Sequence, residues 1–202
     1  MHFVRPFFIL PYLYPDAIWR INNRKNNIYL TFDDGPIPEI TPWILDCLKE
    51  KNIKACFFCV ADNVRKHPEL FQRILDEGHQ VGNHTYNHLK GWDCADDQYL
   101  ENIELADKLI ASPLFRPPYG RIKKSQLREV SKKYQVIMWD VLTGDYDRRI
   151  SPEQCLKNAV QYTRDGSIIV FHDNIKAIEN VKYALPKAID NLSARGFRFS
   201  TF

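Results

Sequence analysis

The sequence contains no long apolar run. Nowhere in its 202 residues is there a stretch close to the ~20 apolar residues that a membrane-spanning helix needs. The most apolar part of the N-terminus, residues 7–10, is flanked by Pro6 and Pro11, and no small-residue cleavage site follows it. We therefore expect no transmembrane segment and no signal peptide. This predicts a cytoplasmic protein, with attachment to the cell envelope as the alternative.

A strong charge of either sign is also missing. The 28 Lys and Arg residues and the 25 Asp and Glu residues give a formal net charge of +3, which is too weak to predict a nucleic-acid-binding protein. The basic group Arg121, Lys123 and Lys124 indicates a solvated helix face. A cationic rim that attracts an anionic polymer stays open as the alternative for this group. Nothing in the composition points to an obligate protein partner.

The cysteines do not form a disulfide framework. There are five, an odd number without regular spacing, which argues against paired bridges and favours a reducing compartment. Cys56 and Cys59 have the spacing of a redox or zinc pair, but they lie in the strand-like stretch ACFFCVA. Residues three apart in a strand point to opposite faces. We therefore expect both to be buried as small apolar residues.

Strand and helix signals alternate along the chain, without internal repeats, low-complexity tracts or interdomain linkers. Strands are predicted at 28–33, 54–60, 80–83, 114–116, 135–141, 167–171 and 197–201. Helices are predicted at 41–51, 68–77, 97–111, 124–134, 152–165 and 176–195. This alternation predicts an α/β fold with a parallel sheet covered by outer helices, and about seven units favour a barrel.

The predicted division of the chain is an N-terminal arm, 1–27, and one catalytic domain, 28–202. Thr41 and Ser151, each followed by proline, are predicted helix N-caps. The aromatic residues of the arm are expected to pack on the domain: Phe7, Phe8, Tyr12, Tyr14 and Trp19.

Two acidic residues end the first predicted strand of the domain. In TFDDGP, residues 31–36, Asp33 and Asp34 follow an apolar run, and Gly35-Pro36 forces a turn. Adjacent carboxylates repel, so the pair predicts a bound cation that stabilises both charges.

The motif HTYNH supplies two imidazoles. His84 and His88 stand at i and i+4, so both rings would face one metal ion if the segment is a helical turn. Two histidines and one carboxylate leave zinc an open position, which is typical of catalytic sites. Arg116 and His172 also follow predicted strands, and such strand ends meet on one face of a parallel α/β barrel.

Four motifs together resemble a known family. TFDDGP, HTYNH, RPPYG at 116–120 and VFHD at 170–173 are similar, in that order, to the motif set of the polysaccharide deacetylases. This is carbohydrate esterase family four, the chitooligosaccharide deacetylase homology domain, and the resemblance covers about residues 28–202. It implies a distorted (β/α) barrel, usually with seven strands. It also implies removal of N-acetyl groups from GlcNAc-containing glycans such as peptidoglycan or chitin, with release of acetate.

The resemblance also implies roles for individual residues. Asp34, His84 and His88 would bind a divalent metal, zinc first, with cobalt, manganese and nickel as alternatives. Asp33 would be the general base, and His172 would be the general acid.

Further residues are implied to support this pair of catalytic groups. Arg116 would keep Asp33 ionised and aimed, and Asp145 would pair with His172 and raise its pKa. Thr85 would orient the metal-binding turn through a hydrogen bond.

The substrate-binding part follows the family less closely. The loop that contains Pro118 and Tyr119 would offer the Tyr119 N–H to the oxyanion. Leu142, Tyr146 and Val170 stand where the family usually has an acid, a tryptophan and a leucine, so the acetyl pocket is expected to differ. Four aromatic residues are candidates for stacking on sugar rings: Trp92, Tyr119, Trp139 and Tyr146.

Three alternatives remain beside the deacetylase. A ring-amide hydrolase of the same superfamily would have an altered metal motif, whereas this one is intact. A catalytically silent glycan-binding module would lack Asp33 or His172, and both are present. A structural metal protein would have four closed ligands, whereas three are found.

Overall fold

The computed structural model describes residues 4–21 and 25–202, and it alternates short strands with helices. The strands are β1 (Ala17–Ile18), β2 (Asn27–Asp33), β3 (Cys56–Cys59), β4 (Gln80–Asn83), β5 (Leu114–Phe115), β6 (Gln135–Ile137), β7 (Val141–Leu142), β8 (Ile168–His172) and β9 (Arg198–Phe199). The helices are α1 (Leu10–Leu13), α2 (Thr41–Glu50), α3 (Ala61–Lys66), α4 (Pro68–Asp76), α5 (Asp96–Ile110), α6 (Lys124–Val130), α7 (Pro152–Gln161) and α8 (Ile178–Ala194). Three single 3₁₀ turns are η1 (Gly91–Asp93), η2 (Pro118–Gly120) and η3 (Ile175–Ala177).

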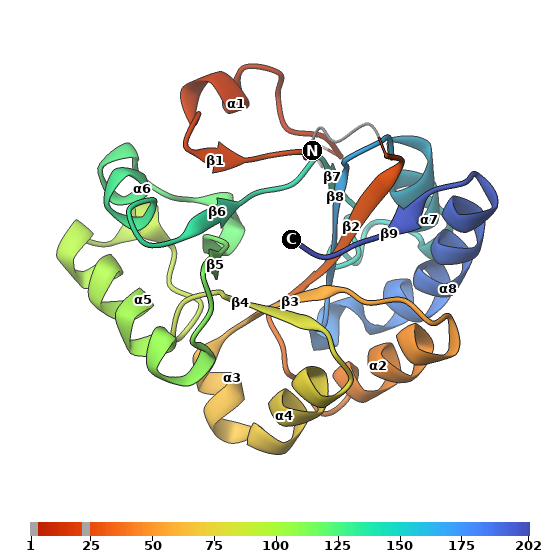
Figure 1. The fold of residues 1–202 in the computed structure, drawn as a ribbon, viewed down its shortest axis with the longest axis horizontal. Coiled ribbons are helices and arrows are strands. Elements are labelled where there is room, and N and C mark those ends of the chain that lie inside the picture. The colour runs from red at the N-terminus through yellow and green to blue at the C-terminus, as the bar shows by residue number, and fades with distance from the viewer. Residues whose placement is uncertain (1–3, 22–24) are drawn as a thin grey trace.

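The strands form one curled parallel sheet with the larger helices on its outer side (Figure 1). Their order is β1-β6-β5-β4-β3-β2-β8-β7, and β9 pairs in addition with β2. The predicted distorted α/β barrel with outer helices is therefore confirmed. The described residues contain nine strands, where about seven were predicted.

The register of the central strands sets the position of the catalytic candidates. Asp33, the last residue of β2, pairs with His172 at the end of β8 on one side and with Phe58 of β3 on the other. His84 and Arg116 directly follow β4 and β5. Because the strands are parallel, all these residues lie at the same edge of the sheet.

The two faces of the sheet pack into different cores. Leu30, Phe32 and Cys59 join the cluster under the outer helices. Tyr29 and Cys56 belong instead to a smaller cluster formed by strand residues. Both cysteines are buried free thiols, as predicted, because alternation along β3 sends them to opposite faces.

The predicted strand 135–141 is divided into β6 and β7, so this prediction was wrong. The carbonyls of Ile137 and Met138 accept hydrogen bonds from the Arg116 guanidinium, at 3.0 and 2.9 Å, where a continuous strand would pair with a neighbour. The buried Arg116 side chain thus takes up backbone carbonyls that would otherwise accept hydrogen bonds from a neighbouring strand.

The two predicted helix caps had different outcomes. Ser151 caps α7, because its side chain accepts from the Gln154 N–H at 3.2 Å. Thr41 does not cap α2. Its hydroxyl accepts from the Ile37 N–H at 2.8 Å and donates to Asp173 Oδ2 at 2.7 Å, so it connects two loops.

The described part of the N-terminal arm contacts β6 and the segment that precedes β8. β1 pairs with β6, and the Ile21 N–H donates to the Gly166 carbonyl just before β8 at 2.9 Å. At Gly166, which has φ +75°, an added Cβ would lie 1.6 Å from the Ile21 carbonyl oxygen, so only glycine permits this approach.

The arm's aromatic residues divide into two groups. Trp19 is buried, and Tyr14 packs beside it. Phe7, Phe8 and Tyr12 are exposed, so the expectation that they pack on the domain was wrong. Within the described residues, no helix has the length and apolar character needed to cross a membrane.

Candidate active site

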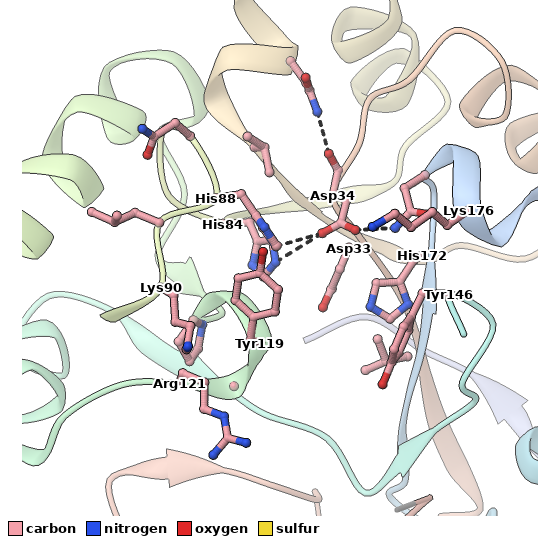
Figure 2. A pocket seen from close by; sticks show the side chains of 18 of the residues that line it. Asp33, Asp34, His84, His88, Lys90, Tyr119, Arg121, Tyr146, His172 and Lys176 are labelled. Carbon is pink, nitrogen blue, oxygen red and sulfur yellow. Dashed lines mark hydrogen bonds and ion pairs between the residues drawn. The ribbon is translucent and has the colours of Figure 1, made fainter. Parts of the chain in front are cut away.

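A cleft of about 1170 Å³ opens at the strand edge that carries the predicted residues (Figure 2). Eight of the eleven predicted site residues line it: Asp33, Asp34, His84, His88, Tyr119, Tyr146, Val170 and His172. The other three are buried behind its wall: Arg116, Pro118 and Asp145. The structure therefore brings the predicted set together at one place.

The three predicted metal ligands converge. Their ligand atoms lie within 4.8 Å of one another, with Asp34 Oδ1 3.6 Å from His84 Nε2 and 3.1 Å from His88 Nε2. His84 Nδ1 contacts the Arg116 carbonyl oxygen at 2.7 Å, so Nδ1 carries the proton and Nε2 turns its lone pair to Asp34. Burial, the main cause, lowers the pKa of His84 to about 4, which keeps the ring neutral at pH 7. This donor set fits a divalent metal ion.

The backbone of HTYNH is not a helical turn, so that condition of the prediction was wrong. Thr85 and His88 have left-handed φ angles of +66° and +60°. Asn83 Oδ1 accepts from the Thr85 N–H at 2.8 Å, and Thr85 Oγ1 accepts from the Leu89 N–H at 3.0 Å. The two imidazole centroids nevertheless lie 5.1 Å apart, because this loop turns both rings toward Asp34.

Asp34 also has a left-handed backbone, with φ +90°. Such a conformation is costly for a residue with a side chain and persists only where the surroundings hold it. Asn63 Nδ2 donates to the Asp34 carbonyl at 2.8 Å, and Asn174 Nδ2 donates to Asp34 Oδ2 at 2.5 Å. Burial pushes the pKa of Asp34 up, but the His88 hydrogen bond and the nearby imidazoles outweigh it and lower this pKa.

Asp33 is oriented by a buried arginine. Arg116 Nη1 donates to Asp33 Oδ1 at 2.6 Å and to Thr31 Oγ1 at 2.8 Å. The guanidinium has no exposed surface and lies 4.0 Å from the centroid of the Phe58 ring. Because Nε and Nη2 of Arg116 donate to the carbonyls of Ile137 and Met138, the guanidinium holds one oxygen of Asp33 in a fixed direction at the base of the cleft.

His172 is paired with a fully buried carboxylate. His172 Nδ1 lies 2.8 Å from Asp145 Oδ1, and its backbone N–H donates to Asp145 Oδ2 at 2.6 Å. Burial, the largest influence, would lower the pKa of His172, but the charge and hydrogen bond of Asp145 and the charges of Asp34 and Asp33 raise it to about 9. The imidazolium form is therefore the main form at neutral pH.

The predicted substrate-binding residues occupy different depths. Tyr119 is 62% exposed, has φ +59°, and places its ring 4.6 Å from that of His88. Tyr146 meets the His172 ring edge-on at 4.8 Å. Val170 is almost completely buried, and its carbonyl accepts from the Thr143 hydroxyl at 2.8 Å.

Two residues of the site were missed from the sequence, namely Asp173 and Asn174. Asp173 is buried and accepts from the Gly35 N–H at 2.9 Å as well as from Thr41. Burial raises the pKa of Asp173 to about 8. A signal was present, because Asp173 is the last residue of the VFHD motif and Asn174 follows it, but these positions alone do not show what the two residues contact.

Comparison with known proteins places the chain in a family. The sequence model of the polysaccharide deacetylase family matches residues 20–139, and the chain belongs to this family. A peptidoglycan-N-acetylglucosamine deacetylase of Bacillus cereus is 36% identical over 185 residues, which cover 88% of this chain and 67% of that protein.

Two solved structures are informative in different ways. A peptidoglycan N-acetylglucosamine deacetylase in complex with a naphthalenyl-N-oxidanyl-benzamide superposes with a TM-score of 0.90 at 33% identity, covering 98% of this chain and 95% of that chain. A pseudoenzyme of carbohydrate esterase family 4 from Bacillus anthracis has a TM-score of 0.79 at 25% identity, covering 91% of this chain and 66% of that chain. The family therefore includes both enzymes and a catalytically silent member.

Proposed function

We propose that this protein is a metal-dependent hydrolase that removes N-acetyl groups from GlcNAc-containing glycans of the peptidoglycan or chitooligosaccharide type. One observation carries the proposal. An Asp-His-His ligand set, a carboxylate held by a buried arginine and an imidazole paired with a buried carboxylate open into the same cleft. The similarity to peptidoglycan-N-acetylglucosamine deacetylases supports this substrate class.

Asp34, His84 and His88 would hold the metal, and zinc is our first choice because this donor set is common at catalytic zinc sites. When bound, the ion would supply Lewis acidity toward the acetyl carbonyl and toward water. The remaining steps belong to the protein's own groups.

Hydrolysis of the amide needs two proton transfers, one from the attacking water to the protein and one from the protein to the leaving nitrogen. Asp33, oriented by Arg116, takes a proton from the attacking water as the new C–O bond forms. The backbone N–H of Tyr119 would stabilise the negative charge that develops on the acetyl oxygen. His172, kept protonated by Asp145, gives its proton to the sugar nitrogen as the C–N bond breaks. The products are acetate and a free amine.

The silent glycan-binding module is the main competing function, because the family contains a pseudoenzyme. The presence and pairing of both proton-transfer groups favour the enzyme here. The location of the protein, cytoplasmic or attached to the cell envelope, stays a prediction.

Acetate release tests the function directly. We expect the purified, metal-loaded protein to release acetate from GlcNAc oligomers or peptidoglycan fragments, to stop when the metal is chelated, and to recover when zinc is returned. A protein that binds these glycans and contains the metal, yet releases no acetate from any of them, would be the silent module instead.

A further inference from the structure

Arg121 lies in the wall of the cleft just beyond the Tyr119 loop. It follows Tyr119 by two residues, so their Cα atoms are at most about 7 Å apart. The Tyr119 ring is in turn 4.6 Å from the ring of His88. Figure 2 shows Arg121 beyond Tyr119, on the side away from Lys176. A group bound by Arg121 would therefore belong to a sugar next to the one that loses its acetyl group.

The Arg121 guanidinium is held by an aromatic ring. Its Cζ lies 4.2 Å from the centroid of the Trp92 ring, and Trp92 Nε1 donates to the Ile122 carbonyl at 3.0 Å. The Gly91 N–H donates to the Arg121 carbonyl at 3.1 Å. An added Cβ on Gly91 would lie 2.8 Å from that oxygen and 2.5 Å from Gln126 Oε1, so the two loops meet too closely for a larger residue. These contacts hold the backbone of Arg121 and place its guanidinium over the Trp92 ring.

The other charged residues on this face of the cleft have partners. Lys90 lies 2.7 Å from Asp93, and Asp62 pairs with two basic residues of α3. Arg121 and Lys176 are exposed, and neither has an ion-pair partner within residues 4–21 and 25–202. Of these two cations, Arg121 is the one that rests on an aromatic ring.

We propose that Arg121 binds a carboxylate on the sugar that neighbours the N-acetylated one, such as the lactyl group of muramic acid in peptidoglycan. This inference rests on the proposed deacetylase function and narrows its substrate to an acidic glycan. A planar guanidinium offers paired N–H donors that match the two oxygens of a carboxylate, and stacking on Trp92 presents them without further ordering. A neutral chitooligosaccharide has no group for this position.

Two oligosaccharides of equal length test the assignment. Both contain GlcNAc and muramic acid, one with the free lactyl carboxylate and one with that group reduced to the alcohol. KM and kcat for acetate release are measured for the metal-loaded wild type and for R121Q, R121K, K176Q and R128Q. Arg128 is an exposed arginine of α6 outside the cleft and serves as the control for loss of one positive charge.

We expect R121Q to raise KM for the charged oligosaccharide about tenfold, with little change in kcat, and to leave the neutral one within about twofold. R121K should recover only part of the loss, because lysine lacks the flat, bidentate group. R128Q should match the wild type on both. Equal effects of R121Q on the two substrates, or an effect of K176Q as large as that of R121Q, would overturn the assignment in favour of a diffuse positive field.

The proposed function can fail separately. If the wild type releases no acetate from either oligosaccharide or from GlcNAc oligomers, the deacetylase activity is refuted. The Kd values of the two oligosaccharides, measured by calorimetry for wild type and R121Q, then decide whether Arg121 binds the carboxylate. The assignment is supported if the wild type binds the charged oligosaccharide more tightly than the neutral one and R121Q binds both with the same Kd. It is overturned if the ratio of the two Kd values is the same in R121Q as in the wild type.

Discussion

Replacing Asp145 with asparagine removes the negative charge that is hydrogen-bonded to His172. In the native protein Asp145 accepts from both the ring Nδ1–H and the backbone N–H of His172, at 2.8 and 2.6 Å. Asparagine has almost the same shape, but it has one acceptor in place of two and carries no charge. The burial of His172 is unchanged by this substitution and still lowers the pKa of the ring. The charge and hydrogen bond of Asp145, which mainly counteract burial, are lost.

The size of the effect follows from the pKa of His172. Its rise from 6.5 to about 9 corresponds to about 3 kcal/mol in favour of the imidazolium. Since the pKa is raised on folding, this contribution to stability is complete below about pH 6.5 and is lost as the pH rises through about 9. In D145N we expect the pKa to fall below 6.5, so that His172 is mostly neutral at pH 7. A general acid contributes roughly 10²–10⁴ to the rate, so kcat at pH 7 should fall about 100-fold.

The assay is initial acetate release by the metal-loaded enzyme across the pH range. For the wild type, kcat should decline only as the pH rises through about 9. For D145N, the decline should begin below pH 7, and activity should partly return on acidification. D147N changes an acid of the same loop that bonds Arg149 and serves as the matched control. If D145N loses activity but its kcat declines over the same alkaline pH range as that of the wild type, Asp145 does not act by keeping His172 protonated.

The two adjacent aspartates should separate in metal analysis: D33N should lose nearly all turnover but keep its metal, whereas D34N should lose the metal as well. Equal metal loss in both would contradict the division of roles between Asp33 and Asp34. Removal of the metal by a chelator should lower Tm, because a ligand that binds only the folded state stabilises it; an unchanged Tm would mean that the Asp-His-His group does not bind the ion tightly. G166A should lower the free energy of unfolding by about 2 kcal/mol or more, since its Cβ would meet the Ile21 carbonyl. G196A has a similar φ of +81° but open space around it, so in chemical denaturation it should cost clearly less; equal losses would remove the packing argument.

Local patterns in the sequence were sufficient for most strands and larger helices and for the polar residues at the strand ends, but α1, β1 and α3 were not predicted. Apolar runs such as the one before Asp33 have the length and composition of buried strands, and parallel strands bring their carboxyl ends to one edge. The burial of the two cysteines of β3 was predicted from the alternation of side chains along a strand. The residue-by-residue assignment of the site depended on the family resemblance of four short motifs.

Backbone conformation at the site could not be predicted in this way. The spacing of His84 and His88 suggested a helical turn, whereas Thr85 and His88 adopt left-handed angles that tertiary hydrogen bonds support. Helical spacing is a local property, but these strained conformations exist only because side chains around them supply the compensating bonds.

Contacts between distant residues were likewise decided by the tertiary structure. Arg116 joins Asp33, Thr31 and two carbonyls at the end of β6, and these contacts interrupt a strand that its composition alone predicts to be continuous. Asp173 supports the loop after Asp34 across 138 positions of the chain.

The sequence by itself determined most of the segments that become strands and helices and which chemical groups stand at their ends, because hydrophobic periodicity and turn residues act over a few positions. Only the tertiary structure decided which of those groups touch, in which direction each points and in which protonation state each is held. Those properties depend on burial and on partners that the chain brings close only when it is folded.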